Sequence, residues 1–265
     1  NSSIVNANRS CATANNATIV SGGFHCNGVQ AGLIAGGSYN YLTNSAGALC
    51  AFGATILNGI GNNTSGGTFS NSPTTNNGMG CFTVLPTISD TGCFSLIGNG
   101  FQNIAQANFS SIVNGYCNNI ASGNTGSSII NGCCNTISGI YNYNVIAGGT
   151  FNIINCNAAS SFIGAGSQNC VGGNFGFVGG GRLNTISCYA SALSVIGGGY
   201  SNTVLGAGAF IGGGYCNCTS SNYAVVLAGS KNCVTNIHTL VGVGCLNQVT
   251  GCYGSVLNGC CNLVT

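Results

Sequence analysis

Cysteine is the residue type with the greatest chemical potential in this sequence, because the 265-residue chain carries 18 of them. Thiols at this density are unusual in a reducing cytosol and favour an oxidising compartment, where they can pair as disulfides. No Cys-x-x-Cys spacing occurs, so the common zinc and thioredoxin-like signatures are missing from the sequence. We therefore expect no metal site and interpret the cysteines as candidate cross-links.

Groups for acid–base chemistry are scarce. A typical soluble domain is about one quarter charged, whereas this chain has four charged residues: Arg9, Asp90, Arg182 and Lys231. One carboxylate cannot form an acid–base pair, and three separate cations cannot follow a phosphate backbone. His25 and Cys26 are adjacent, but neighbouring residues of a strand point to opposite faces. We predict that the chain is not an enzyme, holds no cofactor and does not bind nucleic acid.

Membrane insertion is also not expected. The mean hydropathy is positive at +0.38, yet no apolar run approaches the roughly 18 residues needed to span a bilayer. Together with the cysteine content, this favours an extracellular, cell-surface or virion-surface location.

The elements that must position these residues follow from an internal repeat built on Gly-x-x-Asn. Ile or Val stands three residues before each of eleven successive repeat glycines, which is on the order of one in a billion by chance. The glycines are Gly100, Gly115, Gly132, Gly149, Gly166, Gly181, Gly199, Gly214, Gly229, Gly244 and Gly259. The preceding β-branched residues are Ile97, Ile112, Ile129, Ile146, Ile163, Val178, Ile196, Ile211, Val226, Val241 and Val256.

A second apolar position lies five residues after the last ten glycines, where Thr219 is the one residue other than Ile or Val. Each repeat therefore predicts two short strands with a β-branched residue pointing inward. At the corner between them, Gly can adopt positive φ, and Asn tolerates the left-handed region while its side chain bonds nearby backbone. The corner residues are Asn103, Asn118, Asn135, Asn152, Asn169, Asn184, Asn202, Asn217, Asn232, Asn247 and Asn262.

Two strands and two corners in about 15 residues predict one coil of a narrow parallel β-solenoid. Further coils are expected at Gly37 and Gly59, with degenerate copies at Ala7, Gly22 and Thr87. We thus predict an all-β fold, with residues 1–265 forming a single solenoid domain of about 16 coils.

The pattern Ser-x-Ile-x-Gly-Gly-x-x-Asn-x-Ile-x-Gly-x-x-Ser, clearest at Ser194–Gly206 and Ser127–Gly139, resembles the YadA-like heads of trimeric autotransporter adhesins. Related repeats occur in phage and viral fibres. The resemblance covers most of residues 97–265 and, more loosely, residues 1–64. It implies a left-handed β-roll and a homotrimer.

Equivalent positions in adjacent coils hold three cysteine pairs: Cys117 and Cys134, Cys218 and Cys233, and Cys245 and Cys260. Neighbouring strands lie about 4.8 Å apart, within the usual Cα separation of a disulfide. We predict that some of these pairs are cross-links within or between chains; the alternative is that they are small free thiols packed in a core.

Two further features are candidates for recognition. Tyr116, Tyr200 and Tyr215 each follow a repeat glycine; they either bind a glycan or stack on one another. Insertions near residues 44–52 and 65–82 lengthen the repeat, and loops on a rigid scaffold are common binding sites.

The sequence as a whole predicts a structural, adhesive segment of an extracellular or virion fibre, with a host surface or glycan as receptor. One alternative is an ice-binding or other flat-surface-binding solenoid, although Thr136, Thr185 and Thr203 do not form a continuous threonine ladder. Another is a filament subunit without a ligand. Both ends of the chain are in register with the repeat, so we also expect end-to-end assembly.

Overall fold

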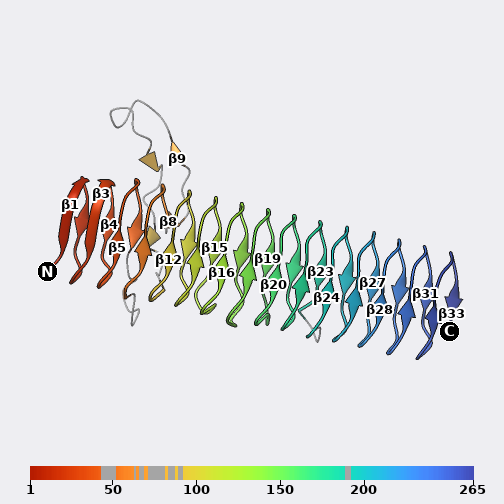
Figure 1. Ribbon diagram of the computed structural model, residues 1–265. Helices are drawn as coiled ribbons and strands as arrows, with labels where there is room; N and C mark the ends of the chain where they lie inside the picture. The colour runs from red at the N-terminus through yellow and green to blue at the C-terminus, as the bar shows by residue number, and fades with distance from the viewer. Residues whose placement is uncertain are drawn as a thin grey trace. The chain divides into compact units, whose positions relative to one another are not determined.

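The computed structural model describes residues 1–42, 52–62, 64–65, 69–70, 81–82, 87–88, 92–188 and 192–265. Every helix or strand in these ranges is a β-strand. The chain divides into two compact units, Asn1–Asn118 and Asn119–Thr265. Each unit is a parallel β-solenoid, in which successive turns stack in chain order (Figure 1). The all-β solenoid predicted from the repeat is therefore confirmed.

The first unit contains six turns. One strand per turn forms the first sheet: β1 (Ser3–Asn8), β3 (Thr18–Gly23), β5 (Leu33–Ile34), β7 (Thr55–Ile56), β12 (Leu96–Ile97) and β14 (Ser111–Ile112). The opposite side of the turns is formed by β2 (Cys11–Ala12), β4 (Cys26–Asn27), β6 (Tyr41–Leu42) and β13 (Ile104–Ala105). Equivalent residues pair in register, as in Ile19 with Ile34.

The coil predicted at Thr87 is wrong. Strand β12 pairs directly with β7, Ile97 opposite Ile56, so no turn lies between them. Strand β11 (Thr87–Ile88) instead pairs antiparallel with β8 (Thr64–Ser65), and β10 (Cys81–Phe82) with β9 (Phe69–Ser70). These four strands belong to the insertion, because their hydrogen bonds join one part of it to another. The count thus falls from the expected sixteen turns to fifteen. Most of both predicted insertions, 44–52 and 65–82, lies outside the described residues.

The second unit contains nine turns. Its first sheet consists of β16 (Ser128–Ile129), β18 (Val145–Ile146), β20 (Phe162–Ile163), β22 (Phe177–Val178), β24 (Val195–Ile196), β26 (Phe210–Ile211), β28 (Val225–Val226), β30 (Leu240–Val241) and β32 (Ser255–Val256). Its second sheet consists of β15 (Asn119–Ile120), β17 (Thr136–Ile137), β19 (Ile153–Ile154), β21 (Cys170–Val171), β23 (Thr185–Ile186), β25 (Thr203–Val204), β27 (Cys218–Thr219), β29 (Cys233–Val234), β31 (Gln248–Val249) and β33 (Leu263–Val264).

The core of each unit lies between the two sides of its turns. All eleven Ile and Val residues predicted to point inward are buried, with exposed fractions of 0–1% except for Val256 at 7%. The β-branched residue of the opposite strand is buried as well in the second unit, for example Ile154 and Ile186. Each turn thus contributes two stiff apolar side chains that suit the pleated inner surface.

Thr219, the exception in the inner ladder, is fully buried, and its hydroxyl oxygen has no hydrogen-bond partner. A buried hydroxyl without a partner costs about 1–3 kcal/mol. Replacing Thr219 with the similarly shaped Val should therefore raise the free energy of unfolding by about 1–2 kcal/mol, measured by chemical denaturation. The matched exchange Val204→Thr, one turn earlier, should lower it; equal effects of opposite exchanges at outward positions would contradict this assignment.

The Gly-x-x-Asn corner has one feature that differs from the prediction. The repeat glycine does take positive φ, +94° at Gly166, where a Cβ would lie 2.0 Å from the Gly181 carbonyl oxygen. The second left-handed residue is the one before the asparagine, such as Leu183 with φ 59°, and none of the eleven corner asparagines has positive φ. The asparagine is instead held by its side-chain hydrogen bonds.

These asparagines form a buried amide ladder in each unit. Asn184 donates from Nδ2 to the Gly180 and Gly199 carbonyl oxygens, at 2.9 Å each, and to Asn169 Oδ1 at 3.2 Å. Its own Oδ1 accepts from the backbone N–H and the side-chain amide of Asn202, both at 3.1 Å. The ladder satisfies backbone groups that the tight corner would leave buried without partners. Asn262, in the last turn, is exposed.

His25 takes the place of the asparagine in one turn of the first unit. Its Nε2 lies 3.1 Å from the Ser21 carbonyl oxygen, and its Nδ1 accepts from the Asn40 backbone N–H at 3.3 Å. This arrangement requires the neutral ring with the proton on Nε2, and burial lowers the pKa of His25. His25 is therefore a corner residue, as its position in the repeat predicts.

Candidate functional site

The outward side of the first sheet in the second unit is apolar over seven consecutive turns. We call this the apolar face. It has a large column, Val145, Phe162, Phe177, Val195, Phe210, Val225 and Leu240, and a column formed mainly by glycine, Ala147, Gly164, Gly179, Gly197, Gly212, Leu227 and Gly242. Phe177 and Phe210 are 41% and 37% exposed. No polar side chain interrupts either column.

The aromatic rings of the apolar face are supported by the glycines beside them. Phe162 and Phe177 stack with their ring centroids 5.4 Å apart. A Cβ at Gly164 or Gly179 would lie 3.5 Å from the Cε1 atom of Phe162 or Phe177 in the same strand. The rings therefore lie over the glycine column, which lowers the relief of the face and makes it suited to a flat contact.

The outward side of the second sheet has a different chemistry. Thr185 and Thr203 are paired neighbours, but the same column continues with Ile153 and Cys170 on one side and Cys218 and Cys233 on the other. Hydroxyl, thiol and apolar groups thus alternate. The column lacks the continuous threonine array that an ice-binding face would need.

Two of the three predicted tyrosines lie together on one corner. Tyr200 and Tyr215 are neighbours on adjacent turns, with stacked rings whose centroids are 5.4 Å apart at an interplanar angle of 8°. Tyr116, in the first unit, stacks on Phe101 in the same way. The rings cover one another's faces, so they present edges and hydroxyl groups to solvent.

Cations border the tyrosine pair. Arg182 is the bridge partner of Tyr200 on the preceding turn, and Lys231 follows Ser230, the bridge partner of Tyr215 on the next turn. Arg182, Tyr200, Tyr215 and Lys231 are all exposed. We call these four residues the tyrosine ridge. Two of the three cations of the chain are therefore gathered over four consecutive turns, which the linear sequence did not suggest.

A second aromatic stack lies at the opposite corner and was not anticipated. His238 lies between Tyr223 and Tyr253, with ring centroids 5.2 and 5.3 Å away and interplanar angles of 3° and 8°. All three residues have positive φ, between 53° and 59°. Their spacing of one repeat was the available signal, but His238 was interpreted as an isolated polar residue.

The predicted cysteine pairs are in register, but none of them forms a disulfide in this structure. Cys218 and Cys233 are Cα partners on β27 and β29. Cys245 and Cys260 are bridge partners whose sulfur atoms lie 2.8 Å apart. Cys117 belongs to the first unit and Cys134 to the second; Cys134 Sγ lies 3.2 Å from Cys133 Sγ.

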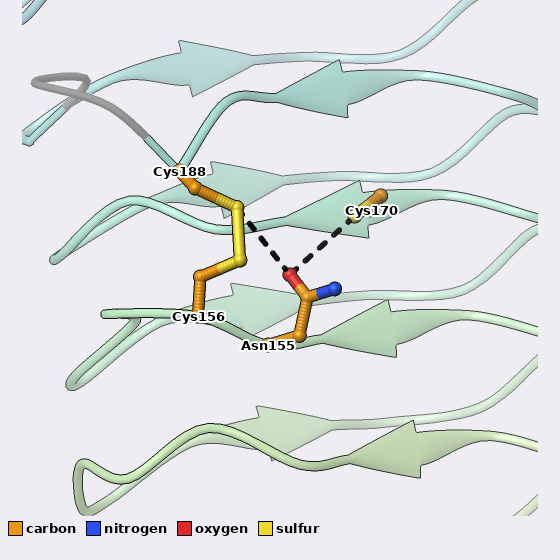
Figure 2. The surroundings of a disulfide bond; sticks show 4 residues. All are labelled: Asn155, Cys156, Cys170 and Cys188. Atoms are coloured by element: carbon orange, nitrogen blue, oxygen red, sulfur yellow. Dashed lines mark hydrogen bonds between the residues drawn. A yellow bond between two sulfur atoms is a disulfide. The ribbon is translucent and has the colours of Figure 1, made fainter.

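The disulfide that the described residues contain joins Cys156 to Cys188 (Figure 2). These residues occupy equivalent positions two turns apart, and their Cα atoms are separated by 5.7 Å. The turn between them has Gly172 at the crossing point, where a Cβ would lie 2.5 Å from Cys188 Sγ. Two turns can be bridged in this way because the intervening residue has no side chain.

A third cysteine lies beside this disulfide. Figure 2 shows Asn155 between Cys170 and Cys188, and its Oδ1 is 3.8 Å from Cys170 Sγ and 3.9 Å from Cys188 Sγ. Burial raises the pKa of Cys170, so this thiol keeps its proton at neutral pH and can donate to the amide oxygen. Because the thiolate is the reactive form, Cys170 is poorly suited to attack the neighbouring disulfide.

The described ranges contain no group of three or more His, Cys, Asp or Glu residues placed to hold a metal ion. In the same ranges, no helix has the length and apolar character required to cross a membrane. The sequence matches no protein-family model, and no curated protein matches it.

Proposed function

We propose that this chain is a structural segment of an extracellular or virion-borne fibre, assembled from several copies packed side by side through the apolar face. The observation that carries the proposal is the composition of that face. Seven consecutive turns present Phe, Val, Leu, Ala and Gly to the outside with no polar side chain between them. Exposed apolar surfaces of this extent are typical of protein interfaces.

The dimensions of the apolar face suit a stable interface. Seven strands about 4.8 Å apart, each turn side about six residues wide at about 3.3 Å per residue, give an area of roughly 700 Å². A standard interface buries about 800 Å² on each partner.

The regularity of the apolar face favours another copy of this chain as the partner. Its ridges and grooves repeat with the strand spacing, and a partner must have the same axial repeat to match all seven turns. A second copy has that repeat by construction. The near absence of charge also removes most of the electrostatic repulsion that would oppose lateral packing.

Substitution on the apolar face should disrupt assembly. Phe177→Lys places a charge in the middle of the face and should convert the oligomer to a monomer, since an unpaired charge in an apolar interface is strongly unfavourable. Size-exclusion chromatography with light scattering measures this; we expect wild-type protein near three times the 26.2 kDa chain mass.

Thr185→Lys, on the outward side of the second sheet in the same turn, is the matched control and should leave the mass unchanged. Circular dichroism checks that both variants stay folded. A wild-type chain that is monomeric at every concentration, or an equal loss of mass in both variants, would refute lateral packing through this face.

The proposal assigns adhesion to surfaces that lateral packing leaves outside. The tyrosine ridge is one such surface, since it lies at a corner and not on the apolar face. Phenol hydroxyl groups beside Arg182 and Lys231 suit a hydroxylated or acidic glycan, because they can donate hydrogen bonds to it.

A further inference from the structure

The cysteines remain unused by a fibre role, and one pair differs chemically from the others. Cys218 and Cys233 are directly opposite each other on β27 and β29, with both side chains on the outward face of the second sheet. Both are half-buried. Thr203 precedes them in the same column and Gln248 follows, so the two thiols form an isolated pair of sulfur atoms.

The two sulfur atoms share a proton. The hydrogen bond from Cys218 lowers the pKa of Cys233 to about 6, against the opposing effect of burial, and the same hydrogen bond raises the pKa of Cys218. Near neutral pH the pair therefore holds one thiolate and one thiol. A thiolate is both the nucleophilic form of cysteine and the form that binds metals.

The other in-register pairs lack this property. In the Cys11–Cys26 pair of the first unit, burial raises the pKa of Cys26. In the Cys245–Cys260 pair, hydrogen bonds with Cys245 and Cys261 raise the pKa of Cys260 to about 12. Cys218 and Cys233 are therefore the pair best prepared to lose a proton to a ligand.

The spacing of the strands suits a ligand that binds two sulfur atoms in a line. Two metal–sulfur bonds of about 2.3 Å each span about 4.6 Å, which is close to the separation of about 4.8 Å between neighbouring strands. Zinc requires four ligands and hard cations require oxygen. The part of the chain that the structure describes offers no third His, Cys, Asp or Glu for such a site. Soft thiolate ligands instead select ions such as Cu(I).

We propose that Cys218 and Cys233 form a two-sulfur site for a soft monovalent cation of the Cu(I) or Ag(I) type. The cation bonds to the Cys233 thiolate and to the Cys218 sulfur, and the Cys218 proton leaves to solvent. No electron is transferred in this step. The site bridges two consecutive turns of the second unit and is independent of lateral assembly.

Silver(I) is a suitable probe because it does not change oxidation state under the conditions of the test. The full-length chain is reduced, freed of reductant without oxygen and loaded with Ag(I). Weakly held metal is then removed by a histidine wash, and the Ag(I) bound per chain is measured by mass spectrometry. Cys218→Ser and Cys233→Ser should each lose one ion relative to wild type.

The double variant Cys218→Ser/Cys233→Ser is the decisive measurement. A shared site predicts that it also loses one ion, whereas two independent thiols predict a loss of two. Cys216→Ser, in the same turn but with Ser201 and Lys231 in the neighbouring turns, is the matched control and should lose none. All four variants should melt at the wild-type temperature; if Cys218→Ser fails to fold, Cys218→Ala replaces it.

Three results would overturn the proposal. The first is a loss of two ions in the double variant, and the second is no loss in either single variant. The third is a Cys218–Cys233 disulfide in peptide maps of native material never exposed to reductant, because a disulfide has no thiolate to offer. None of these results bears on assembly through the apolar face.

Discussion

Replacing Ile163 with alanine is expected to lower the free energy of unfolding by about 2–5 kcal/mol, the range for removing a large aliphatic side chain from a packed core. Ile163 is completely buried and stands in register between Ile146 and Val178 of the neighbouring turns. Those stiff side chains cannot easily collapse into the space that the substitution leaves. Chemical denaturation followed by circular dichroism measures the loss.

Ser167→Ala in the same turn is the control for this substitution. Its hydroxyl accepts a hydrogen bond from Thr150 at an exposed position, and such bonds contribute little, about 1 kcal/mol or less. Equal losses at positions 163 and 167 would show that the inward and outward sides of the turn have been assigned incorrectly.

Replacing Asn184 with alanine should destabilise the protein by about 3 kcal/mol or more, because each buried group left without a partner costs about 1–3 kcal/mol. The substitution removes the donors to the Gly180 and Gly199 carbonyl oxygens and the acceptor of the Asn202 backbone N–H. Chemical denaturation again provides the measurement.

Asn184→Asp separates hydrogen bonding from volume, because it keeps the size of the side chain but replaces the donor with a second acceptor. It should be at least as destabilising as alanine at neutral pH. Asn222→Ala is the control for loss of an amide at an exposed corner, where Oδ1 accepts from the Ala207 backbone N–H at 2.9 Å. If Asn222→Ala costs as much as Asn184→Ala, the buried ladder has no special role.

The fold was accessible from the sequence because the repeat couples distant positions. Ile163 and Gly166 are ordinary residues alone, but their spacing recurs in every turn, and only a parallel stack places equivalent residues together. His25 was correctly interpreted as a corner residue for the same reason, since it occupies the asparagine position of its turn.

Features outside the strict repeat were not accessible. Thr87 was counted as a coil because its surroundings fit the pattern weakly, whereas its backbone hydrogen bonds are made within the insertion. The left-handed residue before each corner asparagine has no compositional signal, since Leu183, Gln168 and Lys231 all adopt this conformation. There the turn geometry overrides local preference.

The candidate sites show the same division. Pairs on adjacent turns, such as Cys218 and Cys233, follow from counting residues. The Cys156–Cys188 disulfide does not, because it skips a turn and depends on Gly172, which leaves room for the crossing. The apolar face requires knowledge of which strand residues point outward, and it emerges once the inward ladder is assigned.

The Cys156–Cys188 disulfide has a consequence for the second unit under tension. When a stack of parallel strands is pulled from its C-terminal end, each turn peels from the one before it and releases about 50 Å of chain for 15 residues. The peeling stops once Cys188 is reached, because the bond is anchored two turns further in. The intervening turn is enclosed in a covalent loop and cannot extend until that bond is reduced. The redox state of one cysteine pair thus sets how far this unit can be drawn out by a load.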